Sequence, residues 1–524
     1  ETDGLNPTRI WLAACKDINS DFVKVCFNRE ELLNTIAKTD IFIGHNILGF
    51  DLHWLKELWD IDIDYRKVED TLVLSTLFNP ERKGGHSLEQ WGIRLKNEKG
   101  KHTDWSKISP DMISYCMQDV RLTGQVYKHL VNSEKEDFSD RSVELEHMIK
   151  HIIAQQERKG FYLNEKKTHM LLSEIKSKSD EILLQVREEI KPSVRLLREV
   201  TPRYKKDGCL AATGLQAIDR PHETVGGPFS MISFEPFNLG SPKQIISRME
   251  RFGWKPVEFT EKGQAKITQK NLETVSSAAP SSIRNLAKWK MLETRVKTIE
   301  GWLDALAADG RVHGKVFPMG AVTGRMTHAE PNLANIVSSN KPYGADLRSC
   351  WTVENVNTHC LVGMDAKGLE LRMLAHYMQD DSFISEVIDG DPHTYNQNAA
   401  GLETRAQAKT FIYALLYGAG AAKIGSIING SSRQGKEIQE KFLQNVPKLG
   451  SLIEAVRRKA SRGYIRGIDG RRLWIRQARA ALNTLLQGGG AIVCKQWSIY
   501  LFDEIHKRKL DAHLVNTIHD EQQY

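Results

Sequence analysis

The sequence predicts a multidomain α/β protein, and three observations lead to this prediction. Residues 1 to about 135 alternate short apolar runs with helical stretches, since "IFIGHNI" has the composition of a buried strand and "FDLHWLKELW" that of a helix start. Such alternation is typical of an α/β domain. The chain becomes purely helical from Asp137, and strand-like runs return after Gly310. Its 524 residues suffice for three or four domains of about 150 residues each.

The composition excludes several classes of protein. Hydrophobic residues make up 40% and charged residues 27% of the chain, as in an ordinary globular protein rather than a disordered one. No apolar run reaches the roughly 18 residues of a membrane span, and "ETDGLNPTRI" resembles no targeting peptide. Seven cysteines without a CxxC pair indicate reduced thiols and argue against disulfides or structural zinc. The net charge of +7 allows an anionic partner such as nucleic acid.

Long helices are predicted after Asp137. One buried stripe with i, i+3, i+4, i+7 and i+8 spacing is formed by Leu145, Met148, Ile149, Ile152 and Ile153. A second helix is expected from Glu165 to Ile190, ending before Pro192. Residues 201–242 are rich in Gly and Pro, so we expect an irregular excursion there.

Two aspartates in the C-terminal half each follow an apolar, strand-like run. Asp365 comes after Leu361–Met364, and Asp520 comes shortly after Leu514–Ile518. Either one alone is more often a solvated side chain. Side by side they would repel each other unless a hard divalent cation with oxygen ligands lay between them. Two such ions about 3.5–4 Å apart would stabilise the attacking and leaving oxygens of a phosphoryl transfer.

A polar stripe runs along the predicted helix in "RAQAKTFIYALLYGAG". Arg405, Lys409, Tyr413 and Tyr417 stand at steps of four, so neighbouring members share a face. Two cations and two phenols suit a nucleoside triphosphate, with cations on the phosphates and rings against base and sugar. The alternative is an amphipathic helix with a charged outer face. The chain has no GxxxxGK[ST] loop that could bind the triphosphate instead.

Four segments resemble the motifs of family A DNA polymerases. They are "GAVTGRMTHAEPNLANI", "DAKGLELR", "RAQAKTFIYALLYGAG" and "HDE", and they stand in the family's order. The similarity is greatest to the replicative polymerases of short-tailed, podovirus-type phages. It implies template-directed DNA synthesis by a right-hand polymerase with a helical thumb, an antiparallel palm sheet and helical fingers.

The resemblance also implies individual residue roles. Asp365 and Asp520 would hold two Mg²⁺ ions, with the Ala366 carbonyl as a further ligand. The implied dNTP-binding residues are Arg405, Lys409, His393, Glu370, Tyr413 and Tyr417. The implied DNA-binding residues are Arg325, Gln487 and His519. Glu521 and Lys409 would join the aspartates in catalysis.

Some implied roles are more specific. Glu370 would exclude a 2′-hydroxyl, Tyr413 would govern acceptance of dideoxynucleotides, and Tyr417 with Gly418 would line the template-base pocket. The chain departs from the family at Lys367, where a serine is usual. A cation there could contact phosphate or weaken metal binding, and the sequence leaves both open.

The N-terminal region resembles the DEDD-type 3′–5′ exonucleases, which have an RNase H-like fold. The matching segments are "GHNILGFD", with Asn46, Phe50 and Asp51, and "YCMQD", with Tyr115 and Asp119 on one helical face. Asp70 also matches a position in the phage enzymes. Tyr115 would be catalytic there, and the implied ligands of Mg²⁺ or Mn²⁺ are Glu1, Asp51 and Asp119.

Both ends of the sequence raise expectations about activity. The family's first exonuclease motif is Asp-x-Glu, and Glu1 matches its Glu, so the preceding Asp is missing from this chain. We therefore expect that the chain as written cannot proofread. After Asp520 the family has a returning strand and a helix, and we expect the returning strand to be missing beyond Tyr524.

The resemblance divides the chain and suggests its partners. The expected parts are exonuclease-like 1–135, thumb 136–305, palm 306–385, fingers 386–485 and a second palm segment 486–524. The protein would be a monomer, with primer–template DNA and dNTPs as its substrates. It would act in the cytoplasm of an infected bacterium and would not bind a membrane. The short stretch at 201–233 has few basic residues, which argues against dependence on thioredoxin. The identity of a processivity factor is therefore open. A replicative helicase is a further candidate partner.

Three other functions compete with this interpretation. A single-subunit RNA polymerase shares the strand-end aspartates, but Glu370, "LYGAG" and the exonuclease-like region disfavour it. A nucleic-acid-binding scaffold with decayed sites conflicts with the intact pair Asp365 and Asp520. An exonuclease alone is disfavoured by the missing first Asp.

Overall fold

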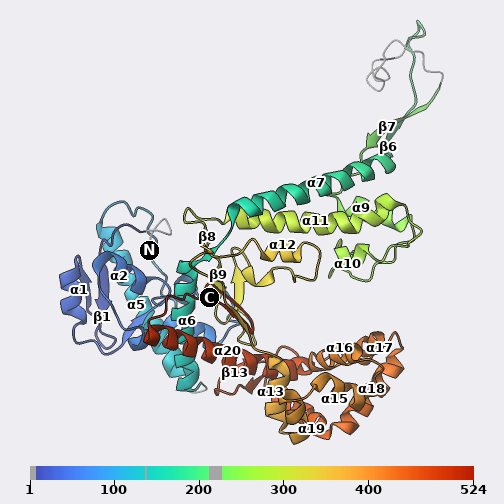
Figure 1. Cartoon of the computed structure of the whole chain (residues 1–524). Coiled ribbons are helices and arrows are strands. Elements are labelled where there is room, and N and C mark those ends of the chain that lie inside the picture. The colour runs from blue at the N-terminus through green and yellow to red at the C-terminus, as the bar shows by residue number, and fades with distance from the viewer. Residues whose placement is uncertain (1–6, 136–137, 210, 212–226) are drawn as a thin grey trace. The chain divides into compact units, whose positions relative to one another are not determined.

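The computed structural model describes residues 7–135, 138–209, 211 and 227–524 of the chain, so the predicted ligand Glu1 lies outside the described residues. The chain forms two compact units (Figure 1). The first comprises residues 1–162, 305–336 and 352–524, and the second comprises 163–304 and 337–351. The chain therefore leaves the first unit and returns to it twice.

The N-terminal part of the first unit mixes strands and helices. Strands β1 (Ala13–Lys16) and β2 (Val23–Cys26) pair in antiparallel fashion, and β3 (Phe42–Gly44) pairs in parallel with β4 (Val68–Asp70). The helices are α1 (Arg29–Ile36), α2 (Asp51–Trp59), η1 (Tyr65–Lys67), α3 (Thr71–Phe78), α4 (Leu88–Leu95) and α5 (Pro110–Ser133). The predicted alternation of strands and helices is confirmed.

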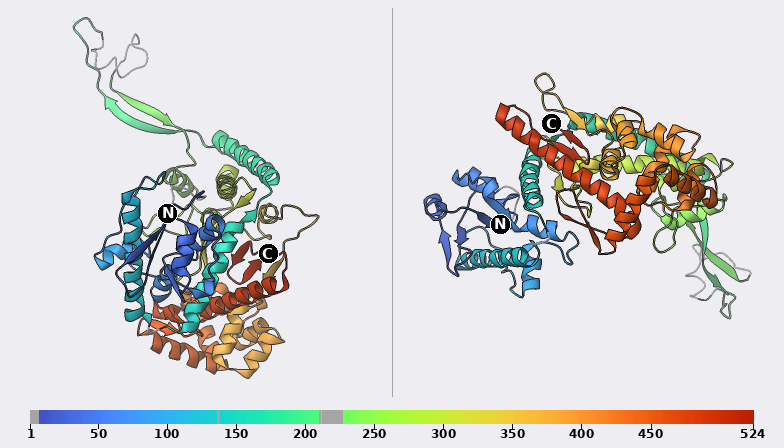
Figure 2. Two further views of the ribbon diagram at one scale, coloured as in Figure 1. Left: turned by 90° about the vertical axis from the view of Figure 1, so that its left-hand side faces the viewer. Right: turned by 90° about the horizontal axis from the view of Figure 1, so that it is seen from below.

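Helix α6 (Asp140–Lys159) follows, and the predicted apolar stripe lies on its buried side. Ile149, Ile152 and Ile153 are at most 2% exposed and pack into a cluster with Ile492 of the long helix α20 (Ala481–Arg508). Figure 2 shows α6 crossing α20. The amphipathic pattern therefore docks α6 onto a helix that lies more than 300 residues later in the chain.

The C-terminal half of the first unit holds small antiparallel sheets and many helices. The pairs are β5 (Phe161–Tyr162) with β8 (Arg311–Val312), β9 (Lys315–Phe317) with β10 (Thr327–Ala329), and β12 (Tyr464–Arg466) with β13 (Arg472–Trp474). The helices are η3 (Leu333–Asn335), α13 (Leu369–Met378), α14 (Asp381–Ile388), α15 (Pro392–Ala400), α16 (Arg405–Leu416), α17 (Ala421–Ile427), α18 (Ser432–Asn445), α19 (Pro447–Ala460) and η4 (Ala478–Ala480).

A three-stranded sheet of order β11-β15-β14 ends the chain, formed by β11 (Gly363–Asp365), β14 (Asn516–Ile518) and β15 (Glu521–Gln523). Asp365 pairs with Glu521 in the register, and Ile518 pairs with the same residue from the other side. The expectation that the returning strand is missing was wrong. Strand β15 is that strand, and it was overlooked because "EQQ" is polar, although Gln522 is only 3% exposed.

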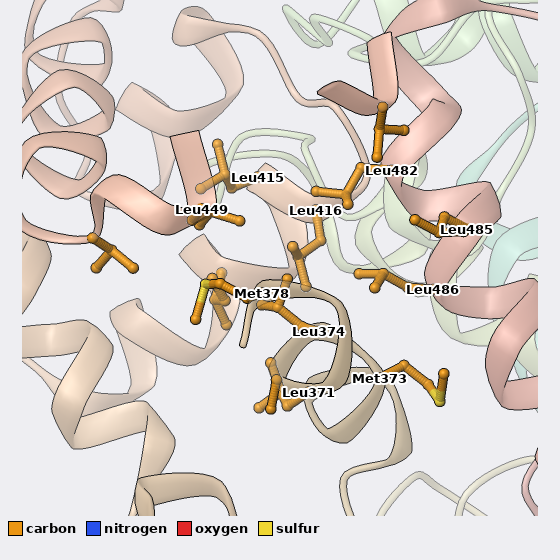
Figure 3. Close-up of a cluster of buried hydrophobic side chains, with 14 of the residues drawn as sticks. Leu371, Met373, Leu374, Met378, Leu415, Leu416, Leu449, Leu482, Leu485 and Leu486 are labelled. Atoms are coloured by element: carbon orange, nitrogen blue, oxygen red, sulfur yellow. The ribbon is translucent and has the colours of Figure 1, made fainter. Parts of the chain in front are cut away.

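A large apolar core fixes the helices of this half. Leucines and methionines of α13, α16, α19 and α20 meet in it, among them Leu374, Leu416 and Leu486 (Figure 3). These three side chains are at most 2% exposed. Burying each such side chain contributes roughly 1.5–3 kcal/mol. The core therefore holds the helices that carry the predicted site residues in fixed positions.

The second unit consists mainly of helices, as predicted. Helix α7 (Glu165–Glu189) runs beside α11 (Ser281–Asp304) (Figure 1). The shorter helices are α9 (Pro242–Glu250), α10 (Gln269–Leu272) and α12 (Gly344–Arg348). In the described part of the chain, no helix is long and apolar enough to cross a membrane.

The expected irregular excursion at 201–242 was wrong at 229–235, and residues 210 and 212–226 of that range lie outside the described residues. Strand β6 (Ser193–Val200) pairs in antiparallel fashion with β7 (Phe229–Glu235), which lies within that range. The alternation in "FSMISFE" is the strand signal, and the neighbouring Gly and Pro residues concealed it.

Candidate active site

The two predicted aspartates meet at the edge of the C-terminal sheet. Asp365 ends β11, and Asp520 lies in the two-residue turn between β14 and β15. The N–H of Ala366 donates to the Asp520 carbonyl at 2.9 Å, which ties the two segments together directly beyond the strands. Because Asp365 also pairs with Glu521 in the register, three carboxylates gather at one edge.

Negative charges lie close together at this edge of the sheet. The pKa of Asp365 is raised above its ordinary value, first by burial and then by the negative charges of Asp520 and Glu521. Gln523 Nε2 donates to Glu521 Oε1 at 2.8 Å and so orients that carboxylate. The arrangement favours binding of a cation, since repulsion between carboxylates this close raises the free energy when all are ionised.

The turn that carries Asp520 has an uncommon backbone. His519 has φ 55°, a left-handed conformation that non-glycine residues seldom adopt. Burial, followed by the nearby charge of Arg325, lowers the pKa of His519 below its ordinary value. The turn therefore places the His519 imidazole next to the edge where the carboxylates gather.

Glu370, on the first turn of α13, is the centre of a hydrogen-bonded group. Arg325 Nη2 donates to Glu370 Oε1 at 3.2 Å, and Tyr417 Oη donates to Glu370 Oε2 at 3.0 Å. Burial raises the pKa of Tyr417, with Glu370 as the next cause, while a hydrogen bond with the Gln487 side chain lowers it. The structure thus brings together four predicted residues from four segments of the chain.

A cavity of about 380 Å³ opens beside these residues. Its lining includes four basic side chains and a histidine, contributed by Lys367, Arg372, His393, Arg405 and Lys409. Tyr413 also lines it, and burial raises the pKa of that phenol, with Glu370 and then Asp520 as further causes. Three of the four residues in the predicted stripe therefore face one cavity near Asp520, while Tyr417 turns to Glu370.

Backbone features add to the positive character of the cavity. Gly368 lines it and is the N-cap of α13, with φ 63° and no side chain capping the helix start. Helix α15 also begins at this cavity, with Pro392, but the Asp391 side chain already caps its start by accepting from the His393 N–H at 3.1 Å. Helix N-termini bind anions because their first N–H groups lack partners within the helix. The donor set suits phosphate oxygens.

One acidic residue of the cavity was missed by the sequence analysis. Asp391 accepts from Arg405 Nε at 2.6 Å and from Arg405 Nη2 at 3.0 Å. These hydrogen bonds hold the pKa of Asp391 well below its ordinary value. The nearby Arg405 and Lys409 charges, after burial as the main cause, lower the pKa of His393.

The carboxylates at the sheet edge fit a divalent cation whose remaining ligands come from the substrate. No group of three or more His, Cys, Asp or Glu side chains in the described ranges is arranged to hold a metal ion. Mg²⁺ in phosphoryl-transfer sites is bound by one or two carboxylates together with substrate phosphates. Asp365 and Asp520, beside a cavity suited to phosphate, match that pattern.

The predicted residues of the N-terminal region lie on two helices. Asp51 begins α2, after Phe50 as N-cap, and Tyr115 and Asp119 lie on α5. Lys99 Nζ lies 3.4 Å from Asp119 Oδ2 and 5.2 Å from the Tyr115 ring centroid. Asp119 and Lys99 are only 18% and 17% exposed. A lysine that the sequence analysis did not single out thus lies between phenol and carboxylate.

Asp70 has a structural role in this region. It is fully buried, and its carboxylate accepts from the N–H groups of Asn46 at 2.8 Å, Leu48 at 3.1 Å and Leu72 at 2.9 Å. The N–H of Asp70 donates to His147 Nε2 at 2.8 Å. Asp70 therefore caps α3 and anchors the "GHNILGFD" loop to α6.

The residue before His147 belongs to a buried ionic cluster that sequence analysis also missed. Glu146, on α6, accepts from Lys495 Nζ at 2.6 and 2.8 Å and from Arg471, which also donates to Asp469. All four side chains are at most 3% exposed. A Cβ at Gly324 would lie 3.5 Å from Arg471 Nη1, so the cluster supports the turn that carries Arg325.

Comparison with known proteins identifies relatives. A family model described as DNA polymerase family A matches residues 218–523. The DNA-directed DNA polymerase of Enterobacteria phage T3 is 32% identical, with 93% of this chain and 86% of that protein covered. The corresponding enzyme of Escherichia phage T7 is 31% identical, with 88% and 82% covered.

A solved structure resembles the fold of the chain. It is the POL domain of Pol1 from M. smegmatis in complex with DNA primer–template and dNTP, with a TM-score of 0.66 and 20% identity. The match covers 87% of this chain and 74% of that one. At this identity it supports the polymerase fold alone.

Proposed function

This chain belongs to DNA polymerase family A, and on that premise we propose that it extends a primer 3′-hydroxyl with dNTPs by metal-assisted phosphoryl transfer at Asp365 and Asp520. The observation that supports this site most strongly is the junction of the two segments through Ala366 and Asp520, beside a cavity rich in basic side chains. Phage replication in an infected bacterial cell is part of the proposal.

The reaction forms one P–O bond and breaks another. The primer 3′-hydroxyl loses its proton to solvent as its oxygen attacks the α-phosphate, the bond to the oxygen bridging the α- and β-phosphates breaks, and pyrophosphate leaves. Lys409 and Arg405 neutralise the phosphates in the cavity, and the Lys409 ammonium can give a proton to the leaving group. Asp391 holds Arg405 in place before the nucleotide binds.

Two Mg²⁺ ions bound at Asp365, Asp520 and the Ala366 carbonyl would supply charge stabilisation for the attacking and leaving oxygens. Glu521 contributes negative charge at the same edge. The main task of the protein here is to hold hard oxygen ligands together against their repulsion.

Selection of deoxynucleotides is proposed for Glu370, which Arg325 and Tyr417 hold in place. Tyr413 would lie against the sugar, and Tyr417 with Gly418 against the template base. Gly418 has φ 75°, and a Cβ there would lie 2.5 Å from the Arg479 carbonyl oxygen, so a larger residue would displace the chain. Gln487, His519 and Arg325 would contact the primer–template.

The remaining assignments are proposals of the same kind. The thumb, palm and fingers would follow the boundaries given above, and residues 1–135 would form a 3′–5′ exonuclease-like domain with Asp51, Tyr115 and Asp119 at its site. A helicase and a processivity factor other than thioredoxin are the proposed protein partners of a monomeric enzyme.

The test is single-nucleotide extension of a primer–template in Mg²⁺. We expect Asp365→Asn and Asp520→Asn each to lower the rate by about 10³-fold or more, since each removes a charged ligand of the transition-state cations. Asp21→Asn, at an exposed position before β2, is the matched control. Extension at the unaltered rate by Asp365→Asn would overturn the assignment.

A further inference from the structure

Lys367 occupies a distinctive place in the cavity. It follows Ala366 and directly precedes the N-cap of α13, Gly368. Its side chain is exposed and lines the cavity together with Arg405 and Lys409. Within the described part of the chain, no hydrogen bond or ion pair engages the Lys367 ammonium. Its charge is therefore available to a ligand.

A hydrogen bond to its main chain fixes the position of Lys367. Arg372 Nε donates to the Lys367 carbonyl at 2.9 Å, which anchors the residue to the first turns of α13. Because Lys367 lines the cavity together with Arg405 and Lys409, its ammonium is placed to meet a ligand bound there.

The cations of the cavity differ in whether a carboxylate already neutralises them, and this bears on the role of Lys367. Asp391 engages Arg405 through two hydrogen bonds, so much of the guanidinium charge is already neutralised. A polyanion entering the cavity would therefore meet Lys367, Arg372 and Lys409, for which no carboxylate partner is found among the described residues. The uncapped start of α13 at Gly368 adds N–H groups on the Lys367 side.

We propose that the Lys367 ammonium is a further ligand of the β- and γ-phosphates of the incoming nucleotide, and hence of the pyrophosphate product. The inference rests on the proposed function, because it takes the cavity to be the nucleotide site. Lys367 is then a specificity residue for the polyphosphate and not for the base or sugar.

The experiment compares the full chain with Lys367→Ser and Lys367→Arg in single-nucleotide primer extension. Lys367→Ser is expected to raise the KM for dNTP about tenfold and to weaken inhibition by pyrophosphate to a similar degree, the loss of one charge-assisted contact. Lys367→Arg keeps the charge and is expected to stay within about twofold of the wild type. Lys38→Ser, at an exposed position remote in sequence, controls for surface charge.

Two further measurements separate the possible failures. The Mg²⁺ concentration for half-maximal rate is expected to be the same in wild type and Lys367→Ser. A lower Mg²⁺ requirement in Lys367→Ser with an unchanged KM would overturn the proposal, since the lysine would then act on the metal site. An unchanged KM together with unchanged pyrophosphate inhibition would overturn it as well.

Calorimetric binding of inorganic tripolyphosphate, without DNA, tests the lysine independently of catalysis. Weaker binding by Lys367→Ser supports the phosphate contact even if the wild type extends no primer, in which case only the proposed function fails. Equal binding by Lys367→Ser and wild type contradicts the proposal even if the enzyme is active.

Discussion

The two carboxylate sites of the first unit differ in how their negative charge is compensated. At the C-terminal sheet, Asp365 lies beside Asp520 and Glu521, and their charges raise its pKa. In the N-terminal region, Asp119 is paired with Lys99 at 3.4 Å. The first site keeps a repulsion that cations and substrate can relieve, whereas at the second the protein supplies a cation of its own. The difference is between carboxylates that repel one another and a carboxylate that an ion pair partly neutralises.

The largest effect is expected at the first site, where one substitution should lower the activity and raise the thermal stability. Asp365→Asn should lower primer extension by about 10³-fold or more, and without divalent cations it should also raise the melting temperature slightly, because it relieves repulsion from Asp520 and Glu521. Extension assays and thermal unfolding in a chelator measure the two effects. A lower melting temperature of the variant would contradict the account of crowded charge.

Helix α6 connects the two regions, and its buried charge gives the next largest effect. Glu146→Gln should destabilise the first unit by about 3–5 kcal/mol, because Lys495 and Arg471 would share only one buried carboxylate. Glu144→Gln, exposed on the same helix, is the control. Denaturant unfolding measures both, and adding Lys495→Met to Glu146→Gln should recover part of the loss. No recovery would show that the pair is not coupled.

The sequence predicts one of these regions better than the other for a physical reason. Asp365, Arg405 and Asp520 belong to contiguous motifs, so their roles and their strands or helices could be inferred together. The ionic cluster could not, since Glu146 and Lys495 are 349 residues apart and each resembles an ordinary charged helix residue.

Local patterns also concealed parts of the fold. The α/β class and the long helices follow from apolar periodicity, but the polar strand β15 and the strand β7 among glycines and prolines do not. Lys99 was missed because its pairing with Asp119 depends on how the loop before α5 folds.

The charge pairing of the second site gives an intermediate effect. Lys99→Met should destabilise the N-terminal part by about 1–2 kcal/mol, since it leaves a mostly buried carboxylate without this cation. The double variant Lys99→Met with Asp119→Asn should recover much of that loss, and the exposed Lys101→Met serves as control. Unfolding free energies from urea titrations test the cycle. Additive losses would mean that the ion pair does not compensate Asp119.

The last effect concerns stability in acid rather than at neutral pH, and it lies where α6 meets the N-terminal part. His151 stacks on Tyr65 with ring centroids 3.8 Å apart, and burial, followed by the Arg158 charge, lowers the His151 pKa to about 4. The unfolded chain binds this proton near pH 6.5, so the stability is complete above pH 6.5 and is lost as pH falls toward 4.

The unfolding free energy should therefore decrease less between pH 6.5 and 4 in His151→Phe than in the wild type, by roughly 1–3 kcal/mol. The exposed His376→Phe should leave the pH dependence as in the wild type. Denaturant midpoints at a series of pH values give the comparison. Equal slopes for His151→Phe and wild type would refute the role of this histidine.

Asp365 and Asp520 are proposed to form together the metal site used in DNA synthesis. The direct measurement is Mn²⁺ binding by electron paramagnetic resonance to the full chain with dideoxy-terminated primer–template and the next dNTP. We expect Mn²⁺ to be bound in this complex, to be lost in both Asp365→Asn and Asp520→Asn, and to be kept in Asp119→Asn. Unchanged Mn²⁺ binding in the first two variants would contradict it.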